Sequence, residues 1–359
     1  MEQCVINAMT CQYCTLPDKL SSQSFVFIWP PQGHTLQKIV KYFETRNMSF
    51  ENIPAENCLH MKIDDASSLL VKLSGLLTKL EAGDTRILVT ASETPSLGEF
   101  GNVMTVASAL RRVRSDWLID ILDQKRYVSY AQPIVSVDGG RETVAHEFLF
   151  RGIAEDGKLI SPDTLFESAQ DPRVFFNLDR AARICAVEAA AQLPTGTDVF
   201  INFMPGSIYD PAVCLRTTVQ AAKENNIAPE RVVFEIVESQ RIDDLNHLRG
   251  IVNFYRDAGF RIALDDFGAG HSNLETFIAL RPDFVKLDKA LTSNLMPNDD
   301  RLDMVKAVTR TFHGAGIKVI AEGIETEENA CVVTACGVDR MQGYYFARPM
   351  PIAEILAAG

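Results

Sequence analysis

The chain has 359 residues, of which 47% are hydrophobic and 23% charged, and its formal net charge is −12. This length predicts two domains, because one domain averages about 150 residues and a closed barrel reaches about 250. The composition excludes long disordered tracts, and the negative charge argues against a surface for duplex nucleic acid, which needs clustered lysine and arginine.

The N-terminal sequence MEQCVINAMTC lacks the basic start and apolar centre of a signal peptide, and no apolar run reaches the roughly 18 residues of a membrane span. We therefore expect a cytoplasmic protein without a membrane span. In that compartment the eight cysteines are expected to be thiols or metal ligands rather than disulfides.

Residues 1–19 form a cysteine-containing segment whose C-x-x-C pair is typical of zinc ligands. The candidate ligands for a structural Zn²⁺ are Cys4, Cys11 and Cys14, with Cys58, His60 or His34 as the fourth. The usual second C-x-x-C pair is absent, so reduced thiols without a metal are the alternative.

Residues 20–125 are predicted to form a small α/β domain of regulatory or sensory type, because apolar residues recur there with strand and helix periods. The predicted strands are 24–29 and 85–91, and the predicted helices are 34–46, 66–80 and 104–125. The last helix would connect this domain to the rest of the chain. Its signal or protein partner is not identified by any motif.

Residues 126–359 alternate short apolar runs with longer amphipathic stretches, which predicts a mainly parallel sheet with crossover helices. The eight candidate strands are 128–135, 143–150, 198–203, 231–237, 261–266, 282–287, 318–322 and 340–346. Helices are predicted at 207–226, 240–258 and 300–315, with Gly259 and Gly316 placed as C-cap residues. Eight strands favour a TIM-like (βα)8 barrel, although an open doubly wound sheet would give similar local patterns.

Isolated polar residues stand at the ends of several of these strands. They are Glu147, Asn202, Glu235, Asp265, Asp266, Lys286, Glu322 and Gln342. In a parallel barrel the C-terminal strand ends converge on the face that carries the chemistry. Converging acids need cations to balance them, and their oxygen atoms suit Mg²⁺ or Mn²⁺ better than zinc. Any one of these residues alone would be interpreted as a strand-end group meeting solvent.

The motifs from about residue 127 to 351 resemble those of the EAL-domain cyclic di-GMP phosphodiesterases. They are YAQPIV, EFLFR for the family's E-x-L-x-R, INF, FEIVES, DDFGAGHSN, VKLD, AEGIE and QGYYFARPM, in the family's order. The resemblance implies an EAL-type barrel that hydrolyses cyclic di-GMP to linear 5′-pGpG with two Mg²⁺ or Mn²⁺ ions. It also implies a homodimer.

The resemblance further implies a role for each matched residue. One metal ion would be surrounded by Glu147, Asn202, Glu235 and Asp265, and the second by Asp265, Asp266 and Glu322. Lys286 would orient the nucleophilic water, Glu322 would accept its proton, Arg151 would clamp a phosphate, and Gln342 and Gln132 would support water or substrate. Glu238 would anchor the loop 265–273, with a solvated carboxylate as the alternative, and His146 is expected to be a packed strand residue.

Two positions depart from the family pattern: Phe148 replaces the alanine of the signature, and His271 replaces an aromatic residue. No expected metal ligand is missing. Two other functions stay open. One is a cyclic di-GMP receptor that does not cut its ligand, against which the intact acids argue. The other is an enolase-like lyase with carboxylate-bound Mg²⁺ and Lys286 as base, which the matched arginine and strand motifs disfavour.

Overall fold

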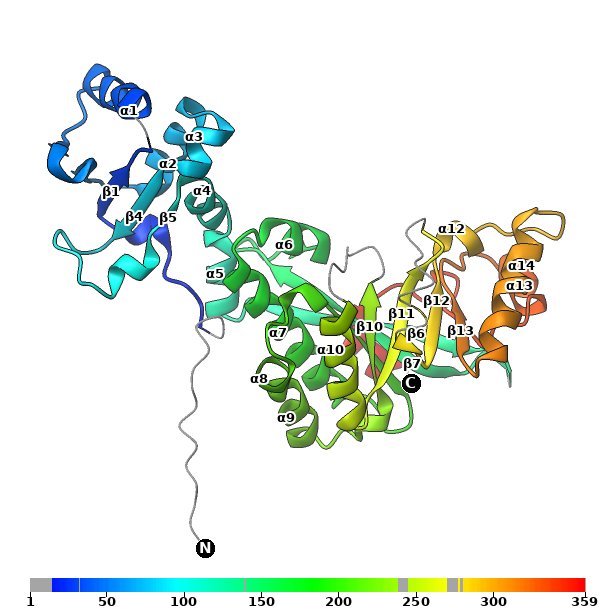
Figure 1. Ribbon diagram of the computed structural model, residues 1–359. Helices are drawn as coiled ribbons and strands as arrows, with labels where there is room; N and C mark the ends of the chain where they lie inside the picture. Colours follow the sequence, from blue (N-terminus) through cyan, green and yellow to red (C-terminus); the bar gives the residue numbers. More distant parts are fainter. Residues whose placement is uncertain are drawn as a thin grey trace, which may run out of the picture. The chain divides into compact units, whose positions relative to one another are not determined.

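The computed structural model describes residues 15–31, 33–138, 140–237, 245–269, 277 and 280–358. Contacts divide the chain into two compact units, drawn in Figure 1. Unit 1 comprises Met1–Arg126 and Asp163–Leu178, and unit 2 comprises Tyr127–Pro162 and Asp179–Gly359. The segment Asp163–Leu178 therefore packs with the N-terminal unit although barrel strands flank it in the sequence.

Unit 1 contains, within its described part, a five-stranded sheet in the order β2-β3-β1-β4-β5. The central strand β1 pairs antiparallel with both β3 and β4. The strands are β1 (Phe25–Trp29), β2 (Glu51–Ile53), β3 (Cys58–Lys62), β4 (Arg86–Thr90) and β5 (Met104–Thr105), and the helices are α1 (Gly33–Thr45), α2 (Ala66–Leu76), α3 (Lys79–Asp84), α4 (Val106–Arg114) and α5 (Asp116–Asp123). The β-α-β-β-α-β order of β1 to β4 is that of ferredoxin-like domains.

The predicted elements at 24–29, 85–91 and 34–46 are present, but two of the predicted helices are divided. The stretch 66–80 is interrupted at Thr78, whose side chain accepts a hydrogen bond from Glu81 N while the Glu81 carboxylate accepts one from Thr78 N. This capping box starts a new helix. The stretch 104–125 begins as strand β5 and divides at Ser115. The sequence interpretation also missed β2 and β3.

Ser115 ties the segment Asp163–Leu178 to the rest of unit 1. Its hydroxyl donates to the Ser168 carbonyl at 2.8 Å and accepts from Gln170 N at 3.0 Å. The Arg112 guanidinium lies nearby, with its Nε 3.9 Å from an Asp171 carboxylate oxygen. Because Ser115 is buried, water cannot replace these hydrogen bonds without opening the contact.

Unit 2 is a closed barrel of eight strands, counted over its described residues, and the pairing of β6 with β7 closes it. The strands are β6 (Tyr127–Ser136), β7 (Thr143–Ile153), β9 (Asp198–Phe203), β10 (Val232–Val237), β11 (Arg261–Phe267), β12 (Phe284–Leu287), β13 (Lys318–Ala321) and β14 (Arg340–Met341). The predicted TIM-like barrel is confirmed. Its first strand, β6, runs antiparallel to both neighbours, whereas the pairs from β7 through β9 to β14 are parallel.

Helices α8 (Pro211–Cys214), α9 (Arg216–Glu224), α10 (Leu245–Asp257), α13 (Arg301–Gly314) and α14 (Glu327–Ala335) lie outside these strands (Figure 1). The predicted helix 207–226 is thus two shorter helices. Gly259 and Gly316 have φ values of +89° and +76°, as expected of C-cap glycines. No helix in the described part of the chain is both long and apolar enough to cross a membrane.

The barrel interior is layered, because alternate side chains of a strand point to the same face. One apolar layer takes one residue from each of seven strands: Ile134, Ala145, Phe200, Val233, Ala263, Phe284 and Ile320. Asp198 and Arg261 come two residues before the apolar-layer residues of their strands. Asp198 pairs with Arg261 and, at 2.9 Å, with Arg340 of β14, and these three residues form a charged layer. The apolar layer separates this charged layer from the opposite end of the barrel.

We predict that a chain beginning at Ser115 unfolds at a higher temperature than one beginning at Tyr127. Without Ser115, the backbone groups of Ser168 and Gln170 each lose one hydrogen bond, worth about 0.5–1.5 kcal/mol net. Circular dichroism during heating measures the difference. As a control, Ser115→Ala in the longer chain should reproduce part of the loss, and equal melting temperatures for both truncated chains would contradict the prediction.

Candidate active site

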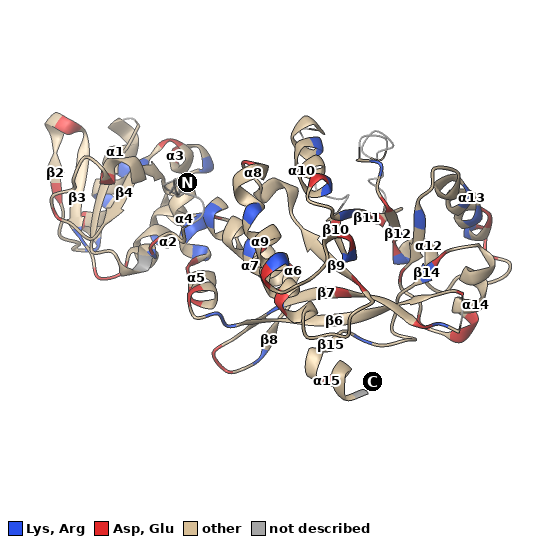
Figure 2. Ribbon diagram, turned by 90° about the horizontal axis from the view of Figure 1, so that it is seen from below, with Lys and Arg blue, Asp and Glu red and all other residues tan. Residues whose placement is uncertain are grey.

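The polar residues predicted to converge form the layer on the C-terminal side of the apolar one. Each lies two residues beyond an apolar-layer residue of the same strand: Glu147 after Ala145, Asn202 after Phe200, Glu235 after Val233, Asp265 after Ala263, Lys286 after Phe284 and Glu322 after Ile320. Antiparallel β6 has the reverse order, and its Gln132 comes two residues before Ile134. The alternation of the strands therefore directs this whole set into the barrel. Figure 2 marks the acidic and basic positions along these strands.

Lys286 lies at the centre of this layer and is only 1% exposed. Its Nζ is 2.7 Å from a Glu322 oxygen and 2.8 Å from a Glu235 oxygen. The same atom is 3.2 Å from Asp265 and 3.4 Å from Glu147. One ammonium group thus faces four carboxylates from four different strand ends, and a single positive charge cannot neutralise all of them.

The charge excess shifts the pKa values of the acids. Burial raises the pKa of Glu235 well above its usual value, although Lys286 opposes this shift. Burial also raises the pKa of Asp265, and it raises the pKa of Glu322 to about 8. Burial also lowers the pKa of Lys286, but the surrounding carboxylates outweigh it and raise that pKa well above normal. Some of the carboxyl groups therefore carry protons at neutral pH unless a further cation displaces them.

Glu147 differs from the other acids because two amides hold it in its charged form. Asn202 Nδ2 donates to one carboxylate oxygen at 2.9 Å, and Gln342 Nε2 donates to the other at 2.7 Å. Burial raises the pKa of Glu147, but Lys286 and these two hydrogen bonds together outweigh it and lower the pKa. Gln132 accepts from Gln342 at 3.1 Å, which fixes that amide in turn.

Two neighbouring aspartates reach the same site through a distortion of β11. In a regular strand Asp265 and Asp266 would point to opposite faces. The pairing of β11 with β12 shifts between Leu264 and Phe267, and Asp266 has a left-handed φ of +58°. Ligand oxygens of Asp265, Asp266 and Glu322 consequently lie within 4.8 Å of one another. Burial and the neighbouring Asp265 raise the pKa of Asp266 to about 6.

A cavity of about 380 Å³ opens over this layer. Of the predicted residues, Gln132, Glu147, Arg151, Asp266, Glu322 and Gln342 line it. Asn202, Glu235, Asp265 and Lys286 are not among the lining residues. Gly343 leaves no room for a side chain, because a Cβ there would come within 2.0 Å of the Ile324 carbonyl oxygen. The predicted substrate side chains and ligand set are therefore brought to one place.

The cavity also shows residues that the sequence interpretation missed. Tyr344 presents an aromatic ring that is 52% exposed, and Asp288 and Lys289 contribute charged groups. Tyr344 and Asp288 stand inside the motifs QGYYF and VKLD, so their position beside matched residues was the available signal. Phe148 is buried and follows Glu147, so it points to the other face of β7, away from the acids.

Several predicted residues lie outside the described residues: Glu238, His271, Cys4, Cys11 and Cys14. The zinc site therefore stays a prediction. Its suggested partner Cys58 is buried, and burial raises the pKa of this thiol to about 11, which disfavours the thiolate that zinc requires. The ring of His60 is stacked on Phe27, with centroids 4.3 Å apart.

The barrel residues fit a hard divalent cation. Glu235 Oε2 is buried without a hydrogen-bond partner in the described part of the chain, which is costly for a carboxylate oxygen unless a cation contacts it. The neighbouring group of Asp265, Asp266 and Glu322 supplies three more carboxylates. Oxygen ligands of this type suit Mg²⁺ or Mn²⁺.

We predict that Lys286→Met destabilises the protein in the presence of a chelator by about 3–5 kcal/mol at pH 8, because it leaves the buried carboxylates without their cation. The loss should shrink at pH 5, where the carboxyl groups, whose pKa values are raised, are protonated. Urea unfolding at both pH values measures it. Lys289 is an exposed lysine of the same cavity, so Lys289→Met should change the free energy of unfolding little. An equal loss of stability in both variants would refute the electrostatic explanation.

The family profile described as EAL domain matches residues 115–349 of this chain. Among curated relatives, the probable cyclic di-GMP phosphodiesterase PdeA of Escherichia coli K12 is 26% identical over 65% of this chain, and the cyclic di-GMP phosphodiesterase PdeF of the same organism is 26% identical over 66%. The matches span only 32% and 31% of the length of those two relatives.

Solved structures of EAL proteins are also similar to this chain. A standalone EAL protein from Vibrio cholerae O395, in its c-di-GMP-bound form, is 33% identical, with a TM-score of 0.58 over 63% of this chain and 93% of that one. An EAL domain protein from Listeria monocytogenes is 25% identical, with a TM-score of 0.59 over 67% of this chain and 94% of that one. The family profile covers more than half of the sequence, and the chain therefore belongs to the EAL domain family.

Proposed function

We propose that this protein hydrolyses cyclic di-GMP to linear 5′-pGpG with the help of two Mg²⁺ or Mn²⁺ ions. The observation that carries the proposal is the pair of adjoining oxygen-ligand groups beneath a cavity lined by Arg151. The names of the two Escherichia coli relatives and the ligand of the Vibrio cholerae structure support this choice of substrate.

The ligand oxygens divide into two sets. One ion would be held by Glu147, Asn202, Glu235 and Asp265, and the other by Asp265, Asp266 and Glu322. When bound, two such ions would acidify a water molecule and offset charge on the phosphate under attack. Asp265 belongs to both sets, and the strand irregularity beside it is what allows Asp266 to join the second.

The protein's own groups would bind the substrate and move the proton. The Arg151 guanidinium, at the cavity wall, is suited to two phosphate oxygens because its donors form a planar fork. The half-exposed ring of Tyr344 offers a surface on which a guanine base could stack. Glu322 lies 2.7 Å from Lys286 at the cavity wall, and burial raises its pKa to about 8. Once bound metal has displaced that proton, the carboxylate would accept a proton from the attacking water.

Two further features of the proposal concern assembly and control. A homodimer is proposed from the family resemblance, and unit 1 is proposed to be a regulatory or sensory domain with a signal or protein partner. The competing function is a cyclic di-GMP receptor that binds without cutting. The receptor is disfavoured because every metal ligand expected from the motifs is present.

The decisive experiment is chromatography of cyclic di-GMP after incubation with the protein and Mg²⁺ or Mn²⁺. Formation of 5′-pGpG that stops on addition of a chelator is the expected result. Binding of cyclic di-GMP, measured by calorimetry, without any product under these conditions would leave the receptor as the function instead.

We predict that Glu147→Gln lowers the rate of 5′-pGpG formation more than about 100-fold, because it removes the charge of a direct metal ligand. Changes to residues that only support the ligands of a metal site already lower metal affinity or activity about 10–100-fold. The glutamine keeps the size of the side chain, so the melting temperature should change little. Product chromatography checks the rate. Glu142→Gln, an exposed change just before the same strand, is the matched control and should retain activity; full activity in Glu147→Gln would remove this residue from the site.

Metal affinity is predicted to rise about tenfold per pH unit between pH 6 and pH 8. The pKa values of Asp266 and Glu322 are raised to about 6 and about 8, so these groups bind protons at the lower pH and must release them to a metal. Titration calorimetry with Mn²⁺ in two buffers of different ionisation enthalpy measures the released protons. Binding at pH 7 without proton release would contradict these shifts.

A further inference from the structure

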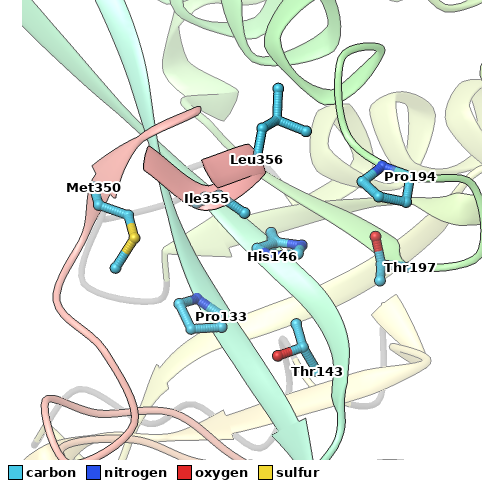
Figure 3. A pocket seen from close by; sticks show the side chains of 8 residues that line it. All are labelled: Pro133, Thr143, His146, Pro194, Thr197, Met350, Ile355 and Leu356. Carbon is cyan, nitrogen blue, oxygen red and sulfur yellow. The ribbon is translucent and has the colours of Figure 1, made fainter. Parts of the chain in front are cut away.

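A second cavity of unit 2 lies on the opposite face of strands β6 and β7 from the acidic layer, and Figure 3 shows it from close by. The register pairs Gln132 with Glu147, which face the barrel interior, and pairs Pro133 with His146 one residue away. Because neighbouring side chains of a strand alternate, Pro133 and His146 face outward, where they line this second cavity.

The walls of the second cavity are mainly apolar. Pro194, Met350, Ile355 and Leu356 face Pro133 across a space of about 390 Å³. This volume is within the range of small-molecule sites, roughly 300–1,000 Å³, and such sites combine apolar walls with a few polar groups. Leu356 is 48% exposed at this position, so the cavity has an apolar rim that solvent can reach.

One polar ring lies in the middle of these apolar walls. His146 is 6% exposed, and its side chain lies among the labelled residues of Figure 3. Its Nδ1 is buried without a hydrogen-bond partner, and the structure gives its ring no hydrogen bond to any residue within the described ranges. The other nitrogen, Nε2, is not among the buried atoms without a partner, so it is the ring atom that a molecule in the cavity can reach. In a neutral imidazole this nitrogen either donates or accepts a hydrogen bond.

We propose that this cavity binds a small, flat, mainly apolar molecule that carries one hydroxyl group, as a phenol does, with the hydroxyl directed to the ring of His146. The Met350 thioether in the cavity wall favours an aromatic ring, because sulfur makes favourable contacts with aromatic rings. A hydroxyl group both donates and accepts, so it satisfies a neutral imidazole in either tautomer. The proposal is independent of the hydrolase activity, because its test needs no cyclic di-GMP.

The test uses two fluorinated probes, 4-fluorophenol and fluorobenzene, with the full chain. Their ¹⁹F line widths during titration give dissociation constants. The full chain should bind 4-fluorophenol about tenfold more tightly than fluorobenzene, which corresponds to one additional hydrogen bond. No binding of either probe at millimolar concentration, or equal binding of both, would overturn the proposal.

Four variants, three of them in helix α15 (Ile352–Ala358), assign any binding to this cavity. His146→Phe keeps a flat ring without nitrogen atoms and should remove the preference for 4-fluorophenol while fluorobenzene still binds. Ile355→Trp should fill the cavity and abolish binding of both probes; Leu356→Trp serves the same purpose if the first variant does not fold. Glu354→Trp, an exposed position of the same helix, is the control and should bind as the parent chain does. Unchanged binding in the filled variants, or an unchanged preference in His146→Phe, would refute the assignment.

Discussion

The buried ammonium group of Lys286 is the interaction on which the barrel's active end depends. It is held by carboxylates from four other strands, of which Glu147, Glu235 and Asp265 are buried and Glu322 reaches the cavity. An unpaired charge in that position would cost several kcal/mol. The strands must therefore close in one register for the charges to meet, so the same contacts that assemble the site also select the closed barrel over a more open sheet.

The layer of apolar side chains beneath Lys286 explains why the carboxyl groups around it have raised pKa values. Phe200 and Phe284 pack in that layer at a centroid distance of 5.2 Å and keep water out of the barrel interior. In such a medium the carboxyl groups hold protons more strongly than they would at a surface. On the other side of this layer Asp198 pairs with Arg261 and Arg340. The interior thus alternates between charged, apolar and charged layers.

The hairpin of β6 and β7 contributes to two different environments. One face carries Gln132 and Glu147 beside the acids, and the other carries Pro133 and His146 beside the C-terminal helix α15 (Ile352–Ala358). A shift of one residue in this pairing would exchange the two faces. The long antiparallel ladder between these strands fixes that register.

The motifs of the sequence predicted the family and, through it, the barrel, whereas strand count alone left an open sheet as an alternative. The sequence also predicted most of the candidate site, because strand alternation places Glu147, Asn202, Glu235 and Lys286 at matching depths whatever the details of packing. It did not determine the short strands β2 and β3 or the helix break at Ser115, where local propensity is weak and contacts decide. The family resemblance predicted that Asp265 and Asp266 share a site, but only the tertiary structure showed how they do so, through an irregular strand and a left-handed residue. The tertiary structure alone showed the cavity around His146, because residues distant in sequence form its walls and no spacing records their meeting.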